Sequence, residues 1–299
     1  MPEYHLPVML KESVAGLNIK PDGNYVDATF GGGGHSGEIL RHIKSGRLFG
    51  FDQDKDTLNN IPENSQFTFI NGNFRFLRQF MRYYKVENLD GVLADLGVSS
   101  HHFDSEDRGF SFRFNSKLDM RMNQSSDLTA YEVINKYDEA TLADLFFYYG
   151  EIRNARLLAS RIVTARSSSD IETTAQLRDI AVGCTSARHE MKYLSQAFQA
   201  LRIEVNGEMT ALKQMLEQAG DLLKPGGRLS VITYHSLEDR LVKNFFKSGN
   251  FSGVAEKDFY GNVLSPFTLV NRKVLIPDAE ELDRNPRSRS AKLRVAEKN

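Results

Sequence analysis

The chain has 299 residues, enough for one large domain or two moderate ones with a sizeable core. Its net charge of −1 excludes a protein-wide attraction for nucleic acid, so any basic footprint must be local. A single cysteine excludes an internal disulfide and a cysteine-based zinc cluster, and we expect no bound metal. The first residues lack a signal-peptide pattern, and no segment reaches the ~20 apolar residues that cross a bilayer. The sequence therefore predicts a cytoplasmic protein without a membrane partner.

Short apolar segments alternate with helical patterns near both ends of the chain. The first half predicts a helix over 36–45 and strands over 24–30, 46–54, 66–74 and 89–100. The alternation resumes with a helix over 208–223 that "KPGG" ends, a strand over 228–234 and a helix over 235–248. Ser236 and Asp239 have the spacing of a capping box at the start of this last helix. Two C-terminal segments, "FTLVNRKVLI" and "AKLRVAEK", predict an antiparallel edge pair. This order is typical of a mostly parallel, doubly wound α/β sheet.

The alternation is interrupted in the middle of the chain. Residues 104–205 carry mostly helical patterns, such as "TLADLFFYYGEIRNARLLASRIVTARS". We therefore predict a helical insertion over 104–205 that recognises the substrate. The α/β domain is then discontinuous and consists of 1–103 and 206–299.

The stretch "GGGGHSG" (31–37) follows the first predicted strand and opens the first helix. Gly32, Gly34 and Gly37 match the G-x-G-x-x-G pattern of nucleotide-binding loops, although a tight turn alone explains such glycines equally well. Asp52 ends the second predicted strand, where a carboxylate can accept both hydroxyls of a ribose. The two features together favour a nucleotide-like cofactor.

Two cofactor classes, nicotinamide dinucleotides and S-adenosylmethionine (SAM), fit this pattern. Asp27, Asp52 and Asp95 end three predicted strands, whose carboxyl ends meet at one edge of a parallel sheet. Three acids suit a cationic cofactor better than an anionic pyrophosphate, so we favour SAM. A nicotinamide-dependent oxidoreductase is one alternative, and a non-catalytic RNA-binding or assembly factor is another.

Motifs in a fixed order along nearly the whole chain add a family resemblance. They include "DATFGGGGHSG", "FDQD", "DGVLADLGVSS", "DRGFSF", "LDMRM", "AFQALRIEVNGE", "LKPGGRLSVITYHSLEDRLVK" and "NPRSRSAKLR". Together they resemble the RsmH (MraW) family of bacterial 16S rRNA cytosine-N4 methyltransferases. The resemblance implies a class I SAM-dependent methyltransferase fold and methylation of the N4 amine of one cytosine in the decoding region.

The resemblance also implies a set of cofactor contacts. Asp52 corresponds to the ribose acid, Phe74 to a contact beside the adenine, and Asp95 to the acid near the methionine end and the reaction centre. The contacts of the glycine loop are Gly33, Gly34 and His35. His102 stands where the family usually has a glutamine, and Gly32 where it often has an arginine.

The N4 amine attacks poorly because its lone pair is delocalised into the ring. Acceptors on its N–H groups help to localise that pair, and Asp95 or the carbonyls of Leu96 and Gly97 would supply them. His235 is a second catalytic candidate, although a structural role suits a lone histidine at a strand–helix junction. Cys184 is far in sequence from the cofactor motifs, which favours direct in-line transfer without a covalent enzyme intermediate. The candidates for stacking on the base are Phe103, Phe110, Phe112 and Tyr234.

Basic residues form three local clusters that could bind RNA phosphates. The candidates are Arg108 and Arg113 after the fourth strand, Arg240 and Lys243 on one helix face, and Arg287 and Arg289 in a C-terminal loop. Given the resemblance, the expected partner is 16S rRNA within the assembled or nearly assembled small ribosomal subunit. A homodimer is compatible with the sequence.

Overall fold

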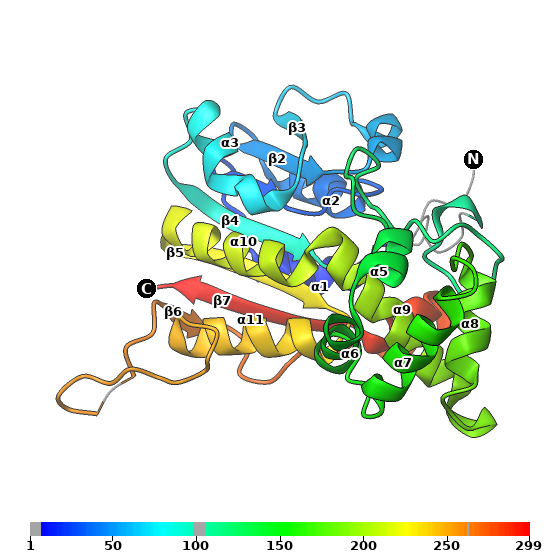
Figure 1. The fold of residues 1–299 in the computed structure, drawn as a ribbon. Coiled ribbons are helices and arrows are strands. Elements are labelled where there is room, and N and C mark those ends of the chain that lie inside the picture. The colour runs from blue at the N-terminus through cyan, green and yellow to red at the C-terminus, as the bar shows by residue number, and fades with distance from the viewer. Residues whose placement is uncertain (1–6, 98–105, 262) are drawn as a thin grey trace. The chain divides into compact units, whose positions relative to one another are not determined.

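The computed structural model describes residues 7–97, 106–261 and 263–299 (Figure 1). The chain forms two compact units, one of residues 1–97 and 209–299 and the other of residues 98–208. No helix in the described residues is long and apolar enough to span a bilayer.

The first unit contains a seven-stranded sheet in the order β3-β2-β1-β4-β5-β7-β6 (Figure 1). The strands are β1 (Asn24–Asp27), β2 (Arg47–Asp52), β3 (Phe67–Asn71), β4 (Leu89–Asp95), β5 (Leu223–Thr233), β6 (Phe267–Leu269) and β7 (Lys292–Lys298). The first five in spatial order are parallel, and β7 runs antiparallel to both β5 and β6. This confirms the predicted α/β sheet and the antiparallel edge pair. The strand order reverses between β1 and β4, where open α/β sheets bind their ligands.

Helices cover both faces of this sheet (Figure 1). The helices of this unit are α1 (Leu10–Gly16), α2 (Gly34–His42), α3 (Leu77–Tyr83), α10 (Glu208–Leu222), α11 (Ser236–Ser248) and α12 (Ala279–Arg284), with short turns η1 (Lys55–Asn60), η2 (Phe74–Phe76) and η5 (Pro286–Ser290). Val26 and Val92 share a buried core with α3, α10 and α11, whereas Tyr25 and Leu93 pack with α1 and α2. Because successive strand residues face opposite sides, burial of both faces makes the strands continuously apolar.

Two local predictions for this unit were wrong. "KPGG" does not end the helix before a separate strand but lies inside β5, whose register against β4 shifts between Leu89 and Gly91. The capping box of α11 is formed by His235 and Glu238, not by Ser236 and Asp239. The longer Glu238 side chain reaches back to accept the backbone N–H of His235 at 3.3 Å. Asp239 instead forms an ion pair with Arg294 of β7.

The described part of the second unit is helical, as predicted for the insertion. Its helices are α5 (Ala130–Lys136), α6 (Glu139–Tyr148), α7 (Ala155–Arg166), α8 (Thr174–Val182) and α9 (Glu190–Asn206), with short turns η3 (Glu106–Arg108) and η4 (Ala187–His189). Leu142, Phe146, Leu158, Leu177 and Leu201 are fully buried in one cluster that contains only residues of this unit. A core of its own is what a separate folding unit requires.

Asp239 ties α11 to β7 and gives a test of this packing. Burial raises its pKa, but Arg294 at 2.7 Å and Lys292 at 3.5 Å outweigh that effect and hold the pKa below its usual value. A lowered carboxyl pKa stabilises the fold above the unfolded pKa of ~4, and this stabilisation is lost as pH falls through the folded pKa. We expect Asp239→Asn to lower the free energy of unfolding by about 1–2 kcal/mol at pH 7, a value reduced for partial exposure.

Urea denaturation of both proteins at pH 7 and at pH 3.5 measures this difference. The difference should shrink at the lower pH, and Asp283→Asn, an exposed change on α12, is the control. An equal difference at both pH values would contradict the ion pair.

Candidate functional site

A buried carboxylate organises the turn between β1 and α2. Asp27, the last residue of β1, is fully buried. Its Oδ2 accepts the Ser36 hydroxyl at 2.7 Å, and its Oδ1 accepts the Thr29 backbone N–H at 3.1 Å. Burial raises the pKa of Asp27. Asp27 thus holds both ends of the glycine loop through Thr29 and Ser36. Neither Ser36 nor Thr29 is among the site residues predicted from the sequence.

The glycines at the start of α2 have distinct conformational requirements. Gly31 and Gly33 have φ angles of +50° and +77°, which side chains disfavour, and Gly33 is the N-cap of α2. A Cβ on Gly34 would lie 2.8 Å from the Pro7 ring. Gly33 and Gly34, predicted as cofactor contacts, are therefore needed by the fold of the loop as well.

Asp52 connects the end of β2 to the same loop. Its Oδ2 accepts the Gly31 backbone N–H at 2.8 Å, and its Oδ1 accepts the Asp54 backbone N–H at 2.8 Å. The side chain is partly exposed, and an ionised carboxylate has about four acceptor positions, so it can still accept hydroxyl groups. Phe74 begins η2 and is partly buried against the core on the α3 side of the sheet.

Asp95 ends β4 on the other side of the point where strand order reverses. Its backbone N–H donates to Thr29 Oγ1 at 2.7 Å, and its Oδ1 accepts the Tyr234 hydroxyl at 2.7 Å. Its Oδ2 lies 3.9 Å from Nδ1 of His35, and about a fifth of the side chain is exposed. The buried His35 places Nε2 3.1 Å from the Val8 carbonyl, which can only accept, so Nε2 carries a proton. Thr29 links Asp27 and Asp95, because its backbone N–H donates to the Asp27 carboxylate and its Oγ1 accepts the Asp95 backbone N–H.

His235 occupies a structural position. Its Nδ1 accepts the Glu238 backbone N–H at 3.4 Å, and its Nε2 lies 3.2 Å from Glu238 Oε1. This is the helix-capping role that a histidine at such a junction can take. His102 and Phe103, predicted as a cofactor contact and a stacking candidate, lie outside the described residues.

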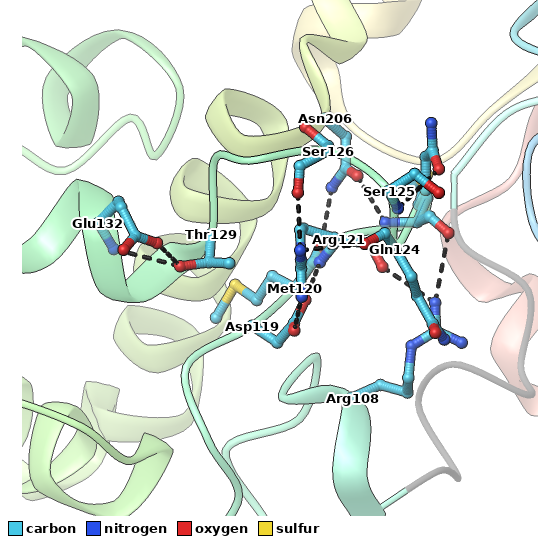
Figure 2. A network of polar contacts seen from close by, with 12 residues as sticks. Arg108, Asp119, Met120, Arg121, Gln124, Ser125, Ser126, Thr129, Glu132 and Asn206 are labelled. Atoms are coloured by element: carbon cyan, nitrogen blue, oxygen red, sulfur yellow. Dashed lines mark hydrogen bonds and ion pairs between the residues drawn. The ribbon is translucent and has the colours of Figure 1, made fainter.

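The predicted RNA-binding arginines differ in their surroundings. Arg108 donates to the backbone carbonyls of Arg121 at 2.9 Å and Met122 at 3.3 Å (Figure 2). Asn206 holds the same loop, because its amide donates to the Met120 carbonyl and its Oδ1 accepts the Met122 N–H, both at 2.8 Å. Met120 has a φ of +60°, so these bonds support a strained turn. Arg108 therefore helps to order the loop rather than projecting freely from it.

The other basic candidates are exposed: Arg113, Arg240, Lys243, Arg287 and Arg289. Thr233 of β5 pairs with Lys292 of β7, and η5 immediately precedes β7. Arg287 and Arg289 in η5 therefore lie at the same edge of the sheet as Asp95.

The buried Asp27 gives a stability test that does not depend on activity. We expect Ser36→Ala to lower the free energy of unfolding by about 1–3 kcal/mol, because a buried acceptor loses a donor. The raised pKa means that the folded state keeps its proton where the unfolded state has lost it, so this residue's contribution falls as pH rises through the folded pKa. The Ser36 hydroxyl itself lowers the pKa of Asp27, so it stabilises the ionised carboxylate more than the protonated one, and its removal should cost more at pH 8 than at pH 5.

Chemical denaturation at both pH values checks this, with Ser195→Ala on α9 as the matched control. The Ser195 hydroxyl bonds only to the Met191 carbonyl on an exposed helix face. A loss for Ser36→Ala no greater than that of the control would show that Asp27 does not depend on the hydroxyl.

The chain is similar to known proteins along nearly its whole length. The model of the MraW methylase family matches residues 3–299. The ribosomal RNA small subunit methyltransferase H of Bacteroides thetaiotaomicron is 59% identical over 296 residues, 99% of this chain and 97% of that protein. The protein of the same name from Parabacteroides distasonis is 60% identical over 297 residues, with the same coverage. Among solved structures, an rRNA methylase from Streptococcus thermophilus covers 97% of this chain and 94% of its own at 12% identity, but its TM-score of 0.42 adds nothing to the fold assignment. On the match along its whole length, the chain belongs to the MraW methylase family.

Proposed function

We propose that this protein methylates the exocyclic N4 amine of a specific cytosine in 16S rRNA of the small ribosomal subunit. The observation that carries the proposal is the whole-chain match to a methylase family, with relatives of about 60% identity that are named as small-subunit rRNA methyltransferases. The carboxylates at the edge of the sheet support it. Because the chain belongs to a methylase family, we no longer favour the alternative of a nicotinamide-dependent oxidoreductase.

As a member of a methylase family, the protein uses SAM as its methyl donor. SAM supplies a methyl group on a cationic sulfur that needs no further activation. The residues present fit such a cofactor, because Asp52 can accept ribose hydroxyls and Asp95 presents negative charge to a cation. Gly33, Gly34 and His35 would hold the methionine side, and Phe74 the adenine side.

Asp95 is the residue that we assign to the reaction. Its partly exposed carboxylate can accept an N–H of the cytosine amine, which localises the nitrogen lone pair and stabilises the positive charge that develops there. The carbonyls of Leu96 and Gly97, which follow β4, are further acceptors. Because binding orients the amine for direct in-line attack, much of the catalysis is positioning.

Methylation at the cytosine C5 carbon would require a different residue. That chemistry generally uses a thiolate that adds to the ring. Cys184 is the only cysteine, and burial raises the pKa of its thiol, which disfavours the reactive thiolate. This supports transfer without a covalent enzyme intermediate.

Exposed basic residues would bind the rRNA backbone. Arg287 and Arg289 lie at the edge of the sheet that carries Asp95, and Arg240 and Lys243 lie in the middle part of α11. Arg113 is exposed in the helical unit, for which we propose a role in recognising the shape of the folded RNA. The assembled or nearly assembled small subunit is the proposed substrate, and extrusion of the cytosine from its stack would expose the amine.

The direct test incubates the protein with labelled SAM and with small subunits from a strain that lacks the modification. We expect label in N4-methylcytidine after digestion of the RNA and separation of its nucleosides. Subunits that already carry the modification are the control. Label found only in 5-methylcytidine, or no label in RNA, would sink the proposal.

Asp52 can be tested by cofactor binding alone. We expect Asp52→Ala to weaken SAM binding about 10- to 100-fold, because hydrogen bonds to a charged group contribute roughly 1.5–3 kcal/mol. Isothermal titration calorimetry gives the dissociation constant, and Asp22→Ala, an exposed change before β1, is the matched control. An unchanged constant for Asp52→Ala would contradict the ribose assignment.

A further inference from the structure

The hydroxyl group of Tyr234 bonds to the carboxylate to which we assign the reaction. Its oxygen lies 2.7 Å from Oδ1 of Asp95, although the two residues are 139 positions apart in the chain. Tyr234 follows the last residue of β5, and Asp95 ends the neighbouring strand β4. The parallel pairing of these strands brings the two side chains to the same edge of the sheet.

The position of Tyr234 is itself fixed on three sides. Its backbone N–H donates to Glu238 Oε2 at 2.8 Å, and its ring packs on a cluster that includes Ile232 and Leu293. Its ring also lies against Gly97, where a Cβ would be 3.3 Å from the ring and φ is +99°. A glycine at 97 thus permits the close approach of the ring to the end of β4.

The Tyr234 hydroxyl is protonated at neutral pH and can donate a hydrogen bond. Burial, together with the negative charge of Asp95, raises the pKa of Tyr234 well above its usual value. The phenol therefore remains protonated at neutral pH. It donates that hydrogen to the Asp95 carboxylate.

We infer that Tyr234 is a positioning residue that holds Oδ1 of Asp95 and so directs Oδ2 toward the bound ligands. The terminal torsion of an aspartate is broad, so the backbone alone does not fix the plane of its carboxylate. Thr29 holds the backbone N–H of Asp95, and the Tyr234 hydroxyl constrains the carboxylate at Oδ1. This inference rests on the proposed function, because it assumes that Asp95 acts on the cofactor or the cytosine.

The sequence also predicts Tyr234 as a candidate for stacking on the flipped base. The two roles need different parts of the side chain, since stacking needs the ring and positioning needs the hydroxyl. Tyr234→Phe removes only the hydroxyl, and Tyr234→Leu removes the ring as well. Tyr137→Phe is the matched control, because it removes a tyrosine hydroxyl that donates to a carboxylate, Glu204, at 2.8 Å in the helical unit.

We expect Tyr234→Phe to lower kcat for methyl transfer about tenfold or more, since small misplacements of a catalytic group can cost up to about 100-fold. Tyr234→Leu should lose at least as much, and Tyr137→Phe should stay within about twofold of the wild type. Thermal unfolding of each variant shows whether it is folded. Transfer by folded Tyr234→Phe at the wild-type rate overturns the inference, and a loss confined to Tyr234→Leu assigns the effect to the ring.

A spectroscopic measurement separates this inference from the proposed function and from misfolding. With 3-fluorotyrosine incorporated at 234 in the full chain, ¹⁹F NMR follows ionisation of the phenol. Asp95→Asn should move that ionisation to lower pH, because the phenolate no longer faces a negative charge, and Asp22→Asn should not. If Asp95→Asn leaves the pH of this ionisation unchanged, the inference is overturned. Absence of methyl transfer by the wild type would instead contradict the proposed function. The fluorotyrosine result would still show whether the Tyr234 hydroxyl interacts with Asp95.

Discussion

The site depends on one buried carboxylate, that of Asp27. A buried polar group without water must find its hydrogen-bond partners in the protein, and Asp27 takes its donors from the turn that follows it and from the first turn of α2. The same turn supplies Thr29 Oγ1 to the backbone N–H of Asp95. The buried acid therefore fixes the glycine loop and the end of β4 together. Tyr234 adds the last bond of this series, on the Asp95 carboxylate.

Sheet topology explains why these residues meet. β1 and β4 are neighbours in the sheet but are separated by two strands in the sequence, and such a reversal of strand order is where open α/β sheets bind their ligands. Asp27, Asp52 and Asp95 end three adjacent parallel strands. Their concentration at one edge suits a cationic cofactor. The antiparallel β7 brings Arg287 and Arg289 to that edge as well, where the RNA backbone would need them.

Much of the fold could be predicted from the periodicity of apolar residues. Two local features could not, and each has a physical reason. The apolar strands and the C-terminal pair were confirmed, as were the family and the SAM cofactor, because buried strands and ordered motifs leave strong local patterns. "KPGG" was misread because glycine and proline stop a helix and also form a bulge within β5. The α11 cap was misread because Ser236 and Asp239 have acceptable residue types, and only the geometry selects His235 and Glu238.

The site itself was foreseen only in part. Carboxylates at strand ends can be predicted from the sequence, because an apolar run that stops at an acidic residue marks the end of a strand. The Tyr234–Asp95 bond cannot, because it joins positions 139 residues apart and depends on strand pairing. Arg108 could not be assigned from the sequence either. Its positive charge predicts a contact with RNA, whereas in the structure its guanidinium donates to two backbone carbonyls. Side-chain partners across long sequence separations need the structure.

The most direct measurement is a crystal structure of the protein with SAM and cytidine. We expect both ribose hydroxyls of SAM within hydrogen-bond distance of the Asp52 carboxylate. We also expect the cytosine amine to face Asp95 while the Tyr234 hydroxyl remains on Oδ1. A cofactor bound away from the ends of β1, β2 and β4, or a cytosine whose amine faces away from Asp95, would contradict the proposed site.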